Sequence, residues 1–327
     1  MHNYKIYGEK NPLTAEEKKY FLDKLNTRYT LGEQLGVSGV NTSTYKIFDK
    51  KNNPFVLRIP NDFNSQFWVE QQISIEKIRT HYLLGYDETI ALPEILELGQ
   101  RYTIEPYLGE PLTKKMYYFN LSNQEKNNIA NQIGTFLNFL HQQKQKNNKG
   151  NIEILSSHPL YSIHDIFNYF TPHLSPKENK TWEKRINLFL TRDTSDEVET
   201  LTHGNIQTQN ILYNTKNKKV AIVDWDTLKN RAQYHDFIPL STFNLPYHLL
   251  KGITTTYNNA EKDTDIKINL QKLLLFHLLT AYYDFGCKAL HDKEQKMKPT
   301  NQIPTLLHQY ITPIEQKIKT LYGKEIC

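Results

Sequence analysis

Apolar and polar residues alternate along several short segments in the first third of the chain, a pattern typical of half-buried β-strands. Small or polar residues separate these segments, and residues 49–53 have the Asp, Lys and Asn content of a tight turn. The predicted strands lie at residues 29–35, 43–48, 54–59, 90–98 and 100–104. Most of the remaining sequence repeats its apolar residues every three or four positions, which predicts amphipathic helices. These helices are expected at residues 13–25, 64–84, 123–143 (capped by Ser122), 161–174, 182–192, 267–290 and 305–321.

A second strand pair is predicted near residue 210, where two β-prone segments at residues 211–213 and 220–223 flank a polar turn. A polar loop precedes the first strand, and an acid ends the second. The hairpin should bring Asn205, Asn210 and Asp224 close together in space. Oxygen ligands from an amide and a carboxylate suit a hard divalent ion such as Mg²⁺, and such a metal can bridge phosphate oxygens.

This region resembles the catalytic core of the aminoglycoside phosphotransferase and choline kinase family, whose fold is shared with protein kinases. The family's pattern is His-Gly-Asp, four residues, Asn, two strands, and then Asp-Trp or Asp-Phe with a second acid. This chain reads His203-Gly204-Asn205, then Asn210, then Asp224-Trp225-Asp226. The spacing matches throughout, but Asn205 stands where the family has its catalytic-base Asp. The alternative is a β-hairpin in an unrelated fold.

The resemblance implies an α+β, two-lobed protein-kinase-like fold, with a small antiparallel-sheet N-lobe and a mostly helical C-lobe. It assigns residues 1–28 to an N-terminal helical extension and residues 29–106 to a nucleotide-binding N-lobe. Residues 107–327 then form a C-lobe that carries the catalytic loop and the acceptor site.

Nucleotide binding is expected at two places in the predicted N-lobe. The small-residue loop with Gly36, Ser38 and Gly39 lies between strands and could lay backbone N–H groups over phosphates, although such a loop can equally be a simple turn. Arg58 lies inside an apolar strand, where a charge needs a partner or a ligand. The resemblance assigns it to the nucleotide phosphates, and the alternative is an edge-strand Arg that reaches solvent.

Two further elements complete this expected nucleotide site. Glu70 and Glu76, on the predicted helix at residues 64–84, could pair with Arg58, and Glu76 lies nearer the family's spacing. Most helical Glu residues simply face water. Glu105 and Tyr107 lie in a stretch that resembles the family's hinge, which holds the adenine edge through its backbone; the sequence alone shows a strand that ends in a Pro/Gly turn.

The expected catalytic residues are Asn205 at the base position, with His203 and Asp236 shaping the loop; Asp236 could also act as a helix N-cap. An Asn side chain cannot accept the proton of an acceptor hydroxyl near neutral pH. Three explanations stay open: an engineered Asp→Asn change, a natural pseudokinase, or an enzyme that uses another base such as Asp226 or a substrate amine. In each of the first two, little or no activity is expected.

Composition narrows the remaining choices. The 40 basic and 35 acidic residues are spread along the chain, so the net charge of +5 gives no basic block and no reason to expect nucleic-acid binding. The two cysteines cannot build a disulfide framework, and neither a signal segment nor an apolar run long enough to span a membrane is evident. We therefore expect a cytoplasmic protein, although secretion into a host cell without a classical signal fits the sequence too. Abundant Asn, Lys, Ile and Tyr with only 13 Gly suggest a bacterial source.

The sequence thus predicts an ATP- or GTP-dependent, Mg²⁺-using phosphotransferase that acts on a small hydroxyl-bearing molecule such as an amino alcohol or an aminoglycoside, impaired by Asn205. The alternative is an inactive pseudokinase that binds a nucleotide or a partner protein. A kinase acting on protein or lipid is a weaker alternative.

Overall fold

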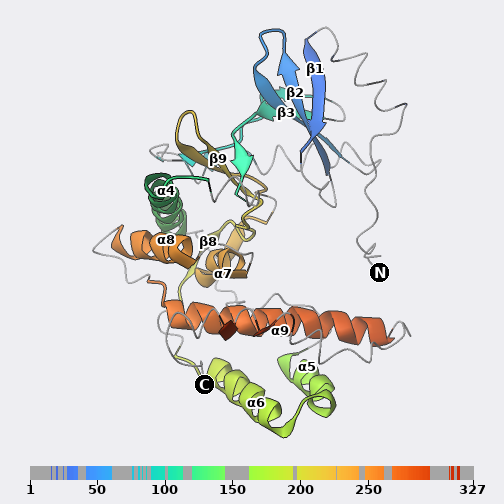
Figure 1. Cartoon of the computed structure of the whole chain (residues 1–327), viewed down its shortest axis with the longest axis vertical. Coiled ribbons are helices and arrows are strands. Elements are labelled where there is room, and N and C mark those ends of the chain that lie inside the picture. The colour runs from blue at the N-terminus through green and yellow to red at the C-terminus, as the bar shows by residue number, and fades with distance from the viewer. Residues whose placement is uncertain are drawn as a thin grey trace. The chain divides into compact units, whose positions relative to one another are not determined.

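The computed structural model describes most of the chain (Figure 1). The residues that it describes are 16, 20, 25, 28–35, 42–60, 76, 80–81, 83, 86, 90–99, 102–112, 120–143, 162–193, 197–225, 227–242, 247–260, 267–294, 309, 311–312 and 315–316. The chain divides into two compact units, one made of Met1–Lys114 with Ile211–Asp226 and the other of Lys115–Asn210 with Thr227–Cys327. The predicted helices at residues 13–25, 64–84 and 305–321 lie mostly outside the described residues.

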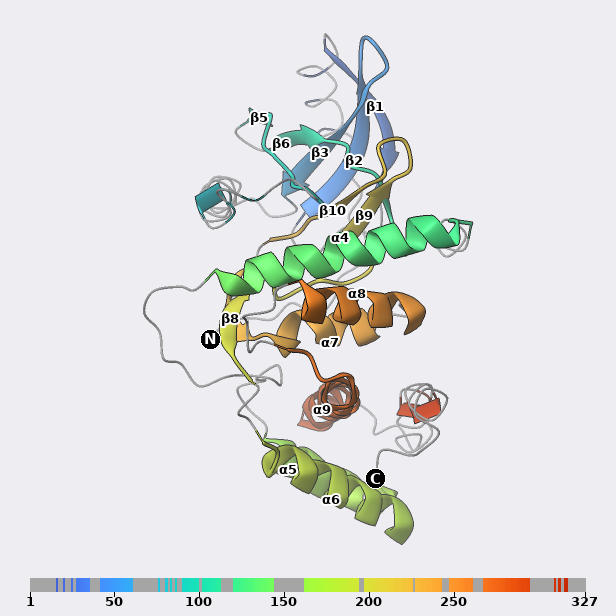
Figure 2. The same cartoon turned by 90° about the vertical axis from the view of Figure 1, so that its left-hand side faces the viewer.

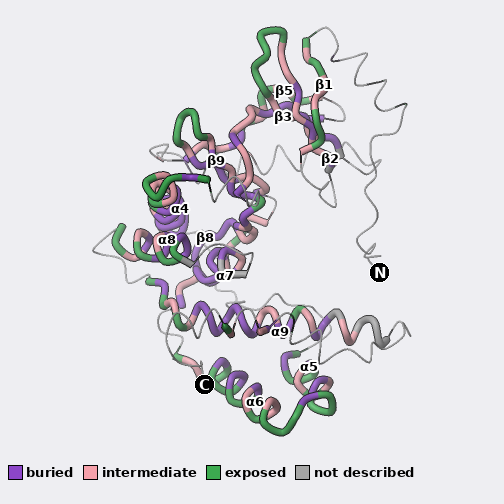
Figure 3. Tube along the Cα trace, viewed as in Figure 1, coloured by how far each residue is buried: buried purple, intermediate pink, exposed green. Residues whose placement is uncertain are grey.

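The first unit contains a five-stranded antiparallel sheet in the order β1-β2-β3-β6-β5. Its strands are β1 (Tyr29–Gln34), β2 (Thr42–Asp49), β3 (Pro54–Pro60), β5 (Glu97–Leu98) and β6 (Thr103–Pro106). The buried positions alternate along β2, so that one face of the sheet forms a core (Figure 3). The buried members of this core are Leu25, Tyr45, Ile47, Leu57, Ile59, Tyr102 and Ile104.

The turn between β2 and β3 confirms the prediction for residues 49–53. The Asp49 carboxylate accepts hydrogen bonds from the backbone N–H groups of Lys51 and Asn53, each at 2.8 Å. Asn52 adopts the left-handed conformation, with φ of 64°, which Asn tolerates better than most residues. The hydrogen bonds from Asn53 lower the pKa of Asp49.

A second sheet of the same unit joins segments that are far apart in the sequence. The predicted hairpin is confirmed as β9 (Ile211–Asn214) and β10 (Lys219–Ile222), which pair antiparallel. β10 also pairs in parallel with β4 (Ile90–Ala91), and β9 pairs with β7 (Glu110–Pro111). The single strand predicted at residues 90–98 is wrong, because it is interrupted after Ala91, where Pro93 cannot donate a ladder hydrogen bond.

Helices dominate the second unit, together with a two-stranded antiparallel sheet of β8 (Glu199–Thr202) and β11 (Lys229–Ala232). The helices are α4 (Asn123–Gln142), α5 (Ile163–Phe170), η1 (Thr171–His173), α6 (Pro176–Leu190), α7 (Tyr234–Thr242), α8 (Tyr247–Asn259) and α9 (Leu270–Glu294). Figure 2 shows α4 beside α8, while α9 lies between α7 and the pair α5 and α6. Within the described residues, no helix has the length and apolar character needed to cross a bilayer.

Three of these helices begin with the same capping box, in which a Ser side chain accepts from a backbone N–H and an acid three residues later returns the bond. The pairs are Ser122 with Glu125, Ser162 with Asp165, and Ser175 with Glu178. The predicted start of α6 at residue 182 is wrong. The sequence signal for the true start is Ser175 followed by Pro176, because Pro favours the first position of a helix.

A close helix contact joins α4 and α8. A methyl group added at Gly134 would lie 2.7 Å from the carbonyl oxygen of Ile253, so glycine lets the two backbones approach. The side chain of Asn138 donates to the carbonyl of Tyr257 at 3.0 Å in the same contact. The contact therefore combines a small residue with a directional hydrogen bond.

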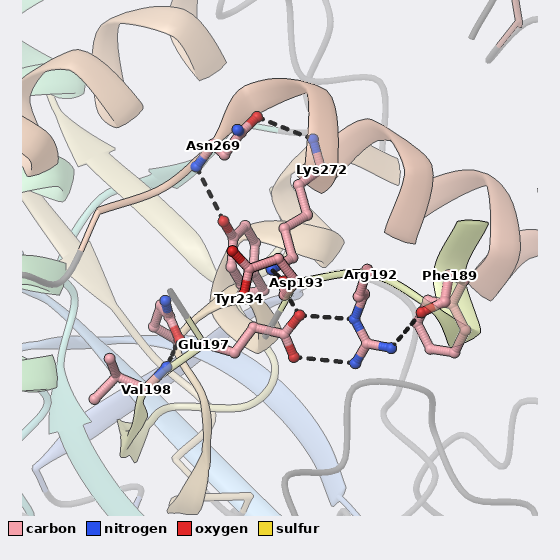
Figure 4. A network of polar contacts seen from close by, with 9 residues as sticks. Phe189, Arg192, Asp193, Glu197, Val198, Tyr234, Asn269 and Lys272 are labelled. Atoms are coloured by element: carbon pink, nitrogen blue, oxygen red, sulfur yellow. Dashed lines mark hydrogen bonds and ion pairs between the residues drawn. The ribbon is translucent and has the colours of Figure 1, made fainter. Parts of the chain in front are cut away.

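A buried ion cluster connects the end of α6, the start of β8 and the start of α9 (Figure 4). The Glu197 carboxylate accepts two hydrogen bonds from Arg192, at 2.7 and 3.0 Å, and lies 2.7 Å from the Lys272 ammonium group. Lys272 also donates to the carbonyl of Asp193 at 2.7 Å, and the side chain of Glu197 is only 1% exposed. The cluster ties the connection between α6 and β8 to α9, which begins more than seventy residues later.

Candidate active site

Asp236 organises the loop that follows β8. It lies in the first turn of α7 and is fully buried. Its Oδ2 accepts from the backbone N–H of His203 at 2.9 Å, and its Oδ1 accepts from that of Gly204 at 2.6 Å. Two backbone donors held by one carboxylate fix the direction of the loop just before Asn205.

Gly204 meets a steric and conformational requirement in this loop. Its φ is +82°, a region that side-chain-bearing residues rarely adopt. A Cβ at this position would lie 2.0 Å from Nη1 of Arg231 and 2.8 Å from the carbonyl oxygen of Thr227. The hydroxyl of Thr227 also donates to the His203 carbonyl at 2.8 Å, so the segment after the hairpin packs directly on the loop.

Asn205 and Asn210 are linked within the same loop. The backbone N–H of Asn205 donates to Nδ1 of His203 at 3.3 Å, and Nδ2 of Asn210 donates to the carbonyl of Asn205 at 2.9 Å. Asn205 is partly exposed, whereas Asn210 is buried. The structure therefore brings together four of the predicted residues: His203, Asn205, Asn210 and Asp236.

His141 extends this arrangement into α4. Its Nε2 lies 3.1 Å from Oδ2 of Asp236, and its Nδ1 lies 2.8 Å from the hydroxyl of Tyr257 on α8. All three side chains are buried. Burial alone would raise the pKa of Asp236, but the hydrogen bond from His141, the nearby His203 and the Gly204 N–H lower it on balance.

The sequence motifs did not identify His141 or Tyr257 as residues of this site. Neither has a local signature, because their contacts span 95 and 116 residues of sequence. A fully buried His on an apolar helix stripe was the one available signal, since such a group needs polar partners.

Asp224 ends the hairpin of the other unit in a strained conformation, with φ of 69°. The next residue, Trp225, is buried and donates from its ring N–H to the carbonyl of Ile222 at 2.9 Å, which anchors the chain where it leaves β10. Non-glycine residues held in the left-handed region occur often at functional sites. The pairing of Asn210 with Asp224 at one metal ion stays a prediction, and Asp226 lies outside the described residues.

Arg58 lies in β3 with its guanidinium 3.8 Å from the Glu105 carboxylate of β6. The hydroxyl of Thr103 donates to the same carboxylate at 3.1 Å. Glu76, the expected partner of Arg58, accepts from the backbone N–H of Ile95 at 3.1 Å. The structure thus adds Glu105 as a partner of Arg58, and a bond between Arg58 and Glu76 stays a prediction.

Tyr107 follows β6 and is held by two side chains. Its hydroxyl donates to Glu110, and the ammonium group of Lys46 lies 4.1 Å from its ring centroid, a cation–π arrangement. These contacts fix the segment expected to serve as the hinge. The predicted phosphate loop with Gly36, Ser38 and Gly39 lies outside the described residues.

The acid stability of this region should depend on His235. Burial, and then the positive charge of Arg231, lower the pKa of His235 from 6.5 to about 4. Between these two values the unfolded chain binds more protons than the folded chain, so stability is present above pH 6.5 and is lost as pH falls toward 4. We expect a loss of at most about 3 kcal/mol over this window.

Urea unfolding at pH 7 and pH 4.5 measures this dependence, with His235→Gln as the test variant. The loss should shrink in His235→Gln and persist in His164→Gln, whose side chain is exposed on α5. An unchanged pH dependence in His235→Gln would contradict the assignment.

The chain is similar to known proteins both in its sequence pattern and in its fold. A family model described as the phosphotransferase enzyme family matches residues 33–261. A GDP complex of a mutant aminoglycoside 2′-phosphotransferase IIIa has a TM-score of 0.61 at 14% identity, over 94% of this chain and 98% of that one. The ternary complex of APH(2″)-IIa with streptomycin and ATP has a TM-score of 0.56 at 15% identity, over 93% and 99%.

Spectinomycin phosphotransferase APH(9)-Ia in complex with ADP and spectinomycin has a TM-score of 0.53 at 14% identity, over 93% of this chain and 95% of that one. No curated protein sequence matches the chain significantly. The predicted α+β, protein-kinase-like fold is confirmed by these structures. Because the family model covers more than half of the 327 residues, the chain belongs to the phosphotransferase enzyme family.

Proposed function

We propose that this protein is a nucleotide-dependent phosphotransferase of a small hydroxyl-bearing molecule, such as an amino alcohol or an aminoglycoside, and that Asn205 impairs it. Family membership supports the reaction class. Structures of similar fold hold ATP, ADP or GDP, and some hold streptomycin, gentamicin, kanamycin or spectinomycin. The proposal therefore includes ATP or GTP as phosphate donor.

The loop held by Asp236 is the observation that carries the proposal. A phosphotransferase gains most of its rate from positioning and charge stabilisation, which require a rigid loop. In this chain the Asp236 carboxylate accepts from the backbone N–H groups of two loop residues. Thr227 donates to the carbonyl of the first of these residues, and Arg231 packs against the second, Gly204. The backbone is thus held in place although the base position carries an amide.

A Mg²⁺ site formed by Asn210 and Asp224 is part of the proposal. Asn210 uses its Nδ2 as a donor to the loop, so its Oδ1 is the end of the amide that suits a cation. Chain connectivity supports the pairing, because Ile211 follows Asn210 and pairs with Ile222, two residues before Asp224. Bound there, Mg²⁺ would neutralise charge on the nucleotide phosphates.

Arg58 is proposed to hold the nucleotide phosphates. A guanidinium group stays protonated and offers several donors in a fixed plane, so one edge can face Glu105 while another binds phosphate oxygens. Glu105 and Tyr107 would contribute to the base-binding hinge.

A nucleotide-binding pseudokinase is the second candidate, and Asn205 is the observation that favours it. An amide in place of the base leaves nucleotide and metal binding intact while it removes proton acceptance. In this case the nucleotide-bound chain would bind a partner protein and would not transfer phosphate to a small acceptor.

Nucleotide binding is tested by thermal unfolding with ATP or GTP, with and without Mg²⁺. A ligand at about 100 times its Kd should stabilise the folded chain by about 2.7 kcal/mol. Arg58→Gln should lose most of this gain, whereas Arg28→Gln, on the exposed pair with Glu97, should keep it. The absence of any stabilisation by either nucleotide would contradict both candidates.

A further inference from the structure

Tyr257 is attached to α4 at two points. Its backbone carbonyl accepts from Nδ2 of Asn138 at 3.0 Å, and its hydroxyl lies 2.8 Å from Nδ1 of His141. The two α4 residues are three positions apart, so they lie on the same side of that helix. The Tyr257 side chain is 1% exposed, and its ring also packs edge-on against Phe237 at 5.0 Å.

The hydroxyl of Tyr257 can donate a hydrogen bond to His141 in this contact. Burial, and then the charge of Asp236, raise the pKa of Tyr257 well above 10, so the phenol keeps its proton. A phenol that donates to Nδ1 of His141 requires Nδ1 to carry no proton. In a neutral His141, Nε2 lies 3.1 Å from the Asp236 carboxylate and so carries the proton, and a Tyr257 hydroxyl that donates to Nδ1 favours the same tautomer.

Asp236 then accepts hydrogen bonds from three donors. His141 and the N–H of His203 share Oδ2, and the N–H of Gly204 donates to Oδ1. In the other tautomer of His141, an unprotonated Nε2 would face a carboxylate, which is repulsive, and the ring or the carboxylate would have to move. Because Asp236 holds the loop through both oxygens, such a movement would reach Gly204 directly.

We propose that Tyr257 is a positioning residue for the catalytic loop, which it controls by fixing the tautomer of His141 and thereby the orientation of Asp236. The proposal rests on the function proposed above, in which this loop carries the base position. It assigns a role in the reaction to α8, a helix that no sequence motif connects with the site.

Tyr282 provides a matched control. It is fully buried like Tyr257, and burial also raises its pKa. Its ring stacks on Trp182 at 4.1 Å, but its hydroxyl has no hydrogen-bond partner among the described residues. Tyr→Phe removes a bonded hydroxyl at residue 257 and an unbonded one at residue 282, with the ring contacts kept in both.

The first experiment needs no activity. The ¹⁵N signals of the His141 ring, assigned with a His141→Gln variant, report the tautomer, and hydrogen exchange reports the amides of His203 and Gly204. In Tyr257→Phe we expect altered ring signals and about fivefold to tenfold faster exchange of these two loop amides, measured relative to the amides of α7. Tyr282→Phe should match the parent. Parent-like ring signals and exchange in Tyr257→Phe would overturn the proposal.

The second experiment reads the reaction in an Asn205→Asp background. Tyr257→Phe should lower kcat by about tenfold and leave the KM for nucleotide unchanged, since the change acts on the loop. A change in KM with kcat retained would overturn the positioning role. An inactive Asn205→Asp background would speak against the proposed function, while the exchange result would still decide whether Tyr257 holds the loop.

Discussion

Replacing Asn205 by Asp is expected to raise the rate of phosphate transfer by about 10²–10⁴-fold, the usual contribution of a general base. The carboxylate has the same shape as the amide and can accept the proton of the acceptor hydroxyl. The loop around it is already fixed, since Asp236 holds the two preceding residues and Asn210 bonds the carbonyl of residue 205. The substitution should therefore restore chemistry without requiring the loop to refold.

Transfer of phosphate from ATP and GTP to a panel of amino alcohols and aminoglycosides measures this gain. Asn217→Asp is the matched control, because Asn217 is exposed in the turn between β9 and β10 and its side-chain oxygen already accepts from the backbone of Lys219. Asn217→Asp should leave the rate unchanged. If Asn205→Asp is as inactive as the parent on every acceptor, an impaired kinase is ruled out, and retained nucleotide binding would then favour the binding module.

Glu197→Gln is expected to lower the free energy of unfolding by about 3 kcal/mol, at the low end for breaking a buried ion pair. The carboxylate is the partner of both Arg192 and Lys272, whose side chains are 17% and 12% exposed. Glutamine has nearly the same volume but no charge, so two largely buried cations would lose their counterion (Figure 4). Aromatic rings line the same site, with Phe189 4.1 Å from the Arg192 guanidinium, and they cannot replace a carboxylate.

Urea unfolding at pH 7 compares this variant with Glu97→Gln. Glu97 also accepts two hydrogen bonds from an Arg, Arg28, but that pair is exposed, and exposed pairs contribute about 0.2–1 kcal/mol. Equal losses in the two variants would show that burial does not strengthen the Glu197 cluster.

The sequence predicted those elements whose signals are local. The turn at Asp49, the capped start of α4 at Ser122 and the hairpin of β9 and β10 all depend on neighbouring residues, and all three are confirmed. It did not predict that β4 pairs with β10 or β7 with β9, because these pairings join segments about a hundred or more residues apart. Strands of two residues have too little periodicity to indicate their partners.

Within the site, too, the sequence predicted the features with local signals and missed the long-range contacts. Motif spacing identified the loop residues and Asp236, and the structure brings them together. The structure pairs Arg58 with Glu105, which the sequence had placed in the hinge. The pairing could not be predicted, because it depends on the register of β3 and β6, which decides which side chains share a face of the sheet. Tyr257 depends on how α8 packs on α4, which no single segment encodes.

The three Ser-and-acid boxes at the starts of α4, α5 and α6 have a consequence for how the chain tolerates change. Four consecutive residues fix the N-terminus of each helix, so its first turn does not depend on the length of the connection before it. Insertions or deletions upstream of Ser122, Ser162 or Ser175 should leave the apolar stripe of each helix pointing the same way. Relatives could therefore vary these connections freely while they keep the helices in phase.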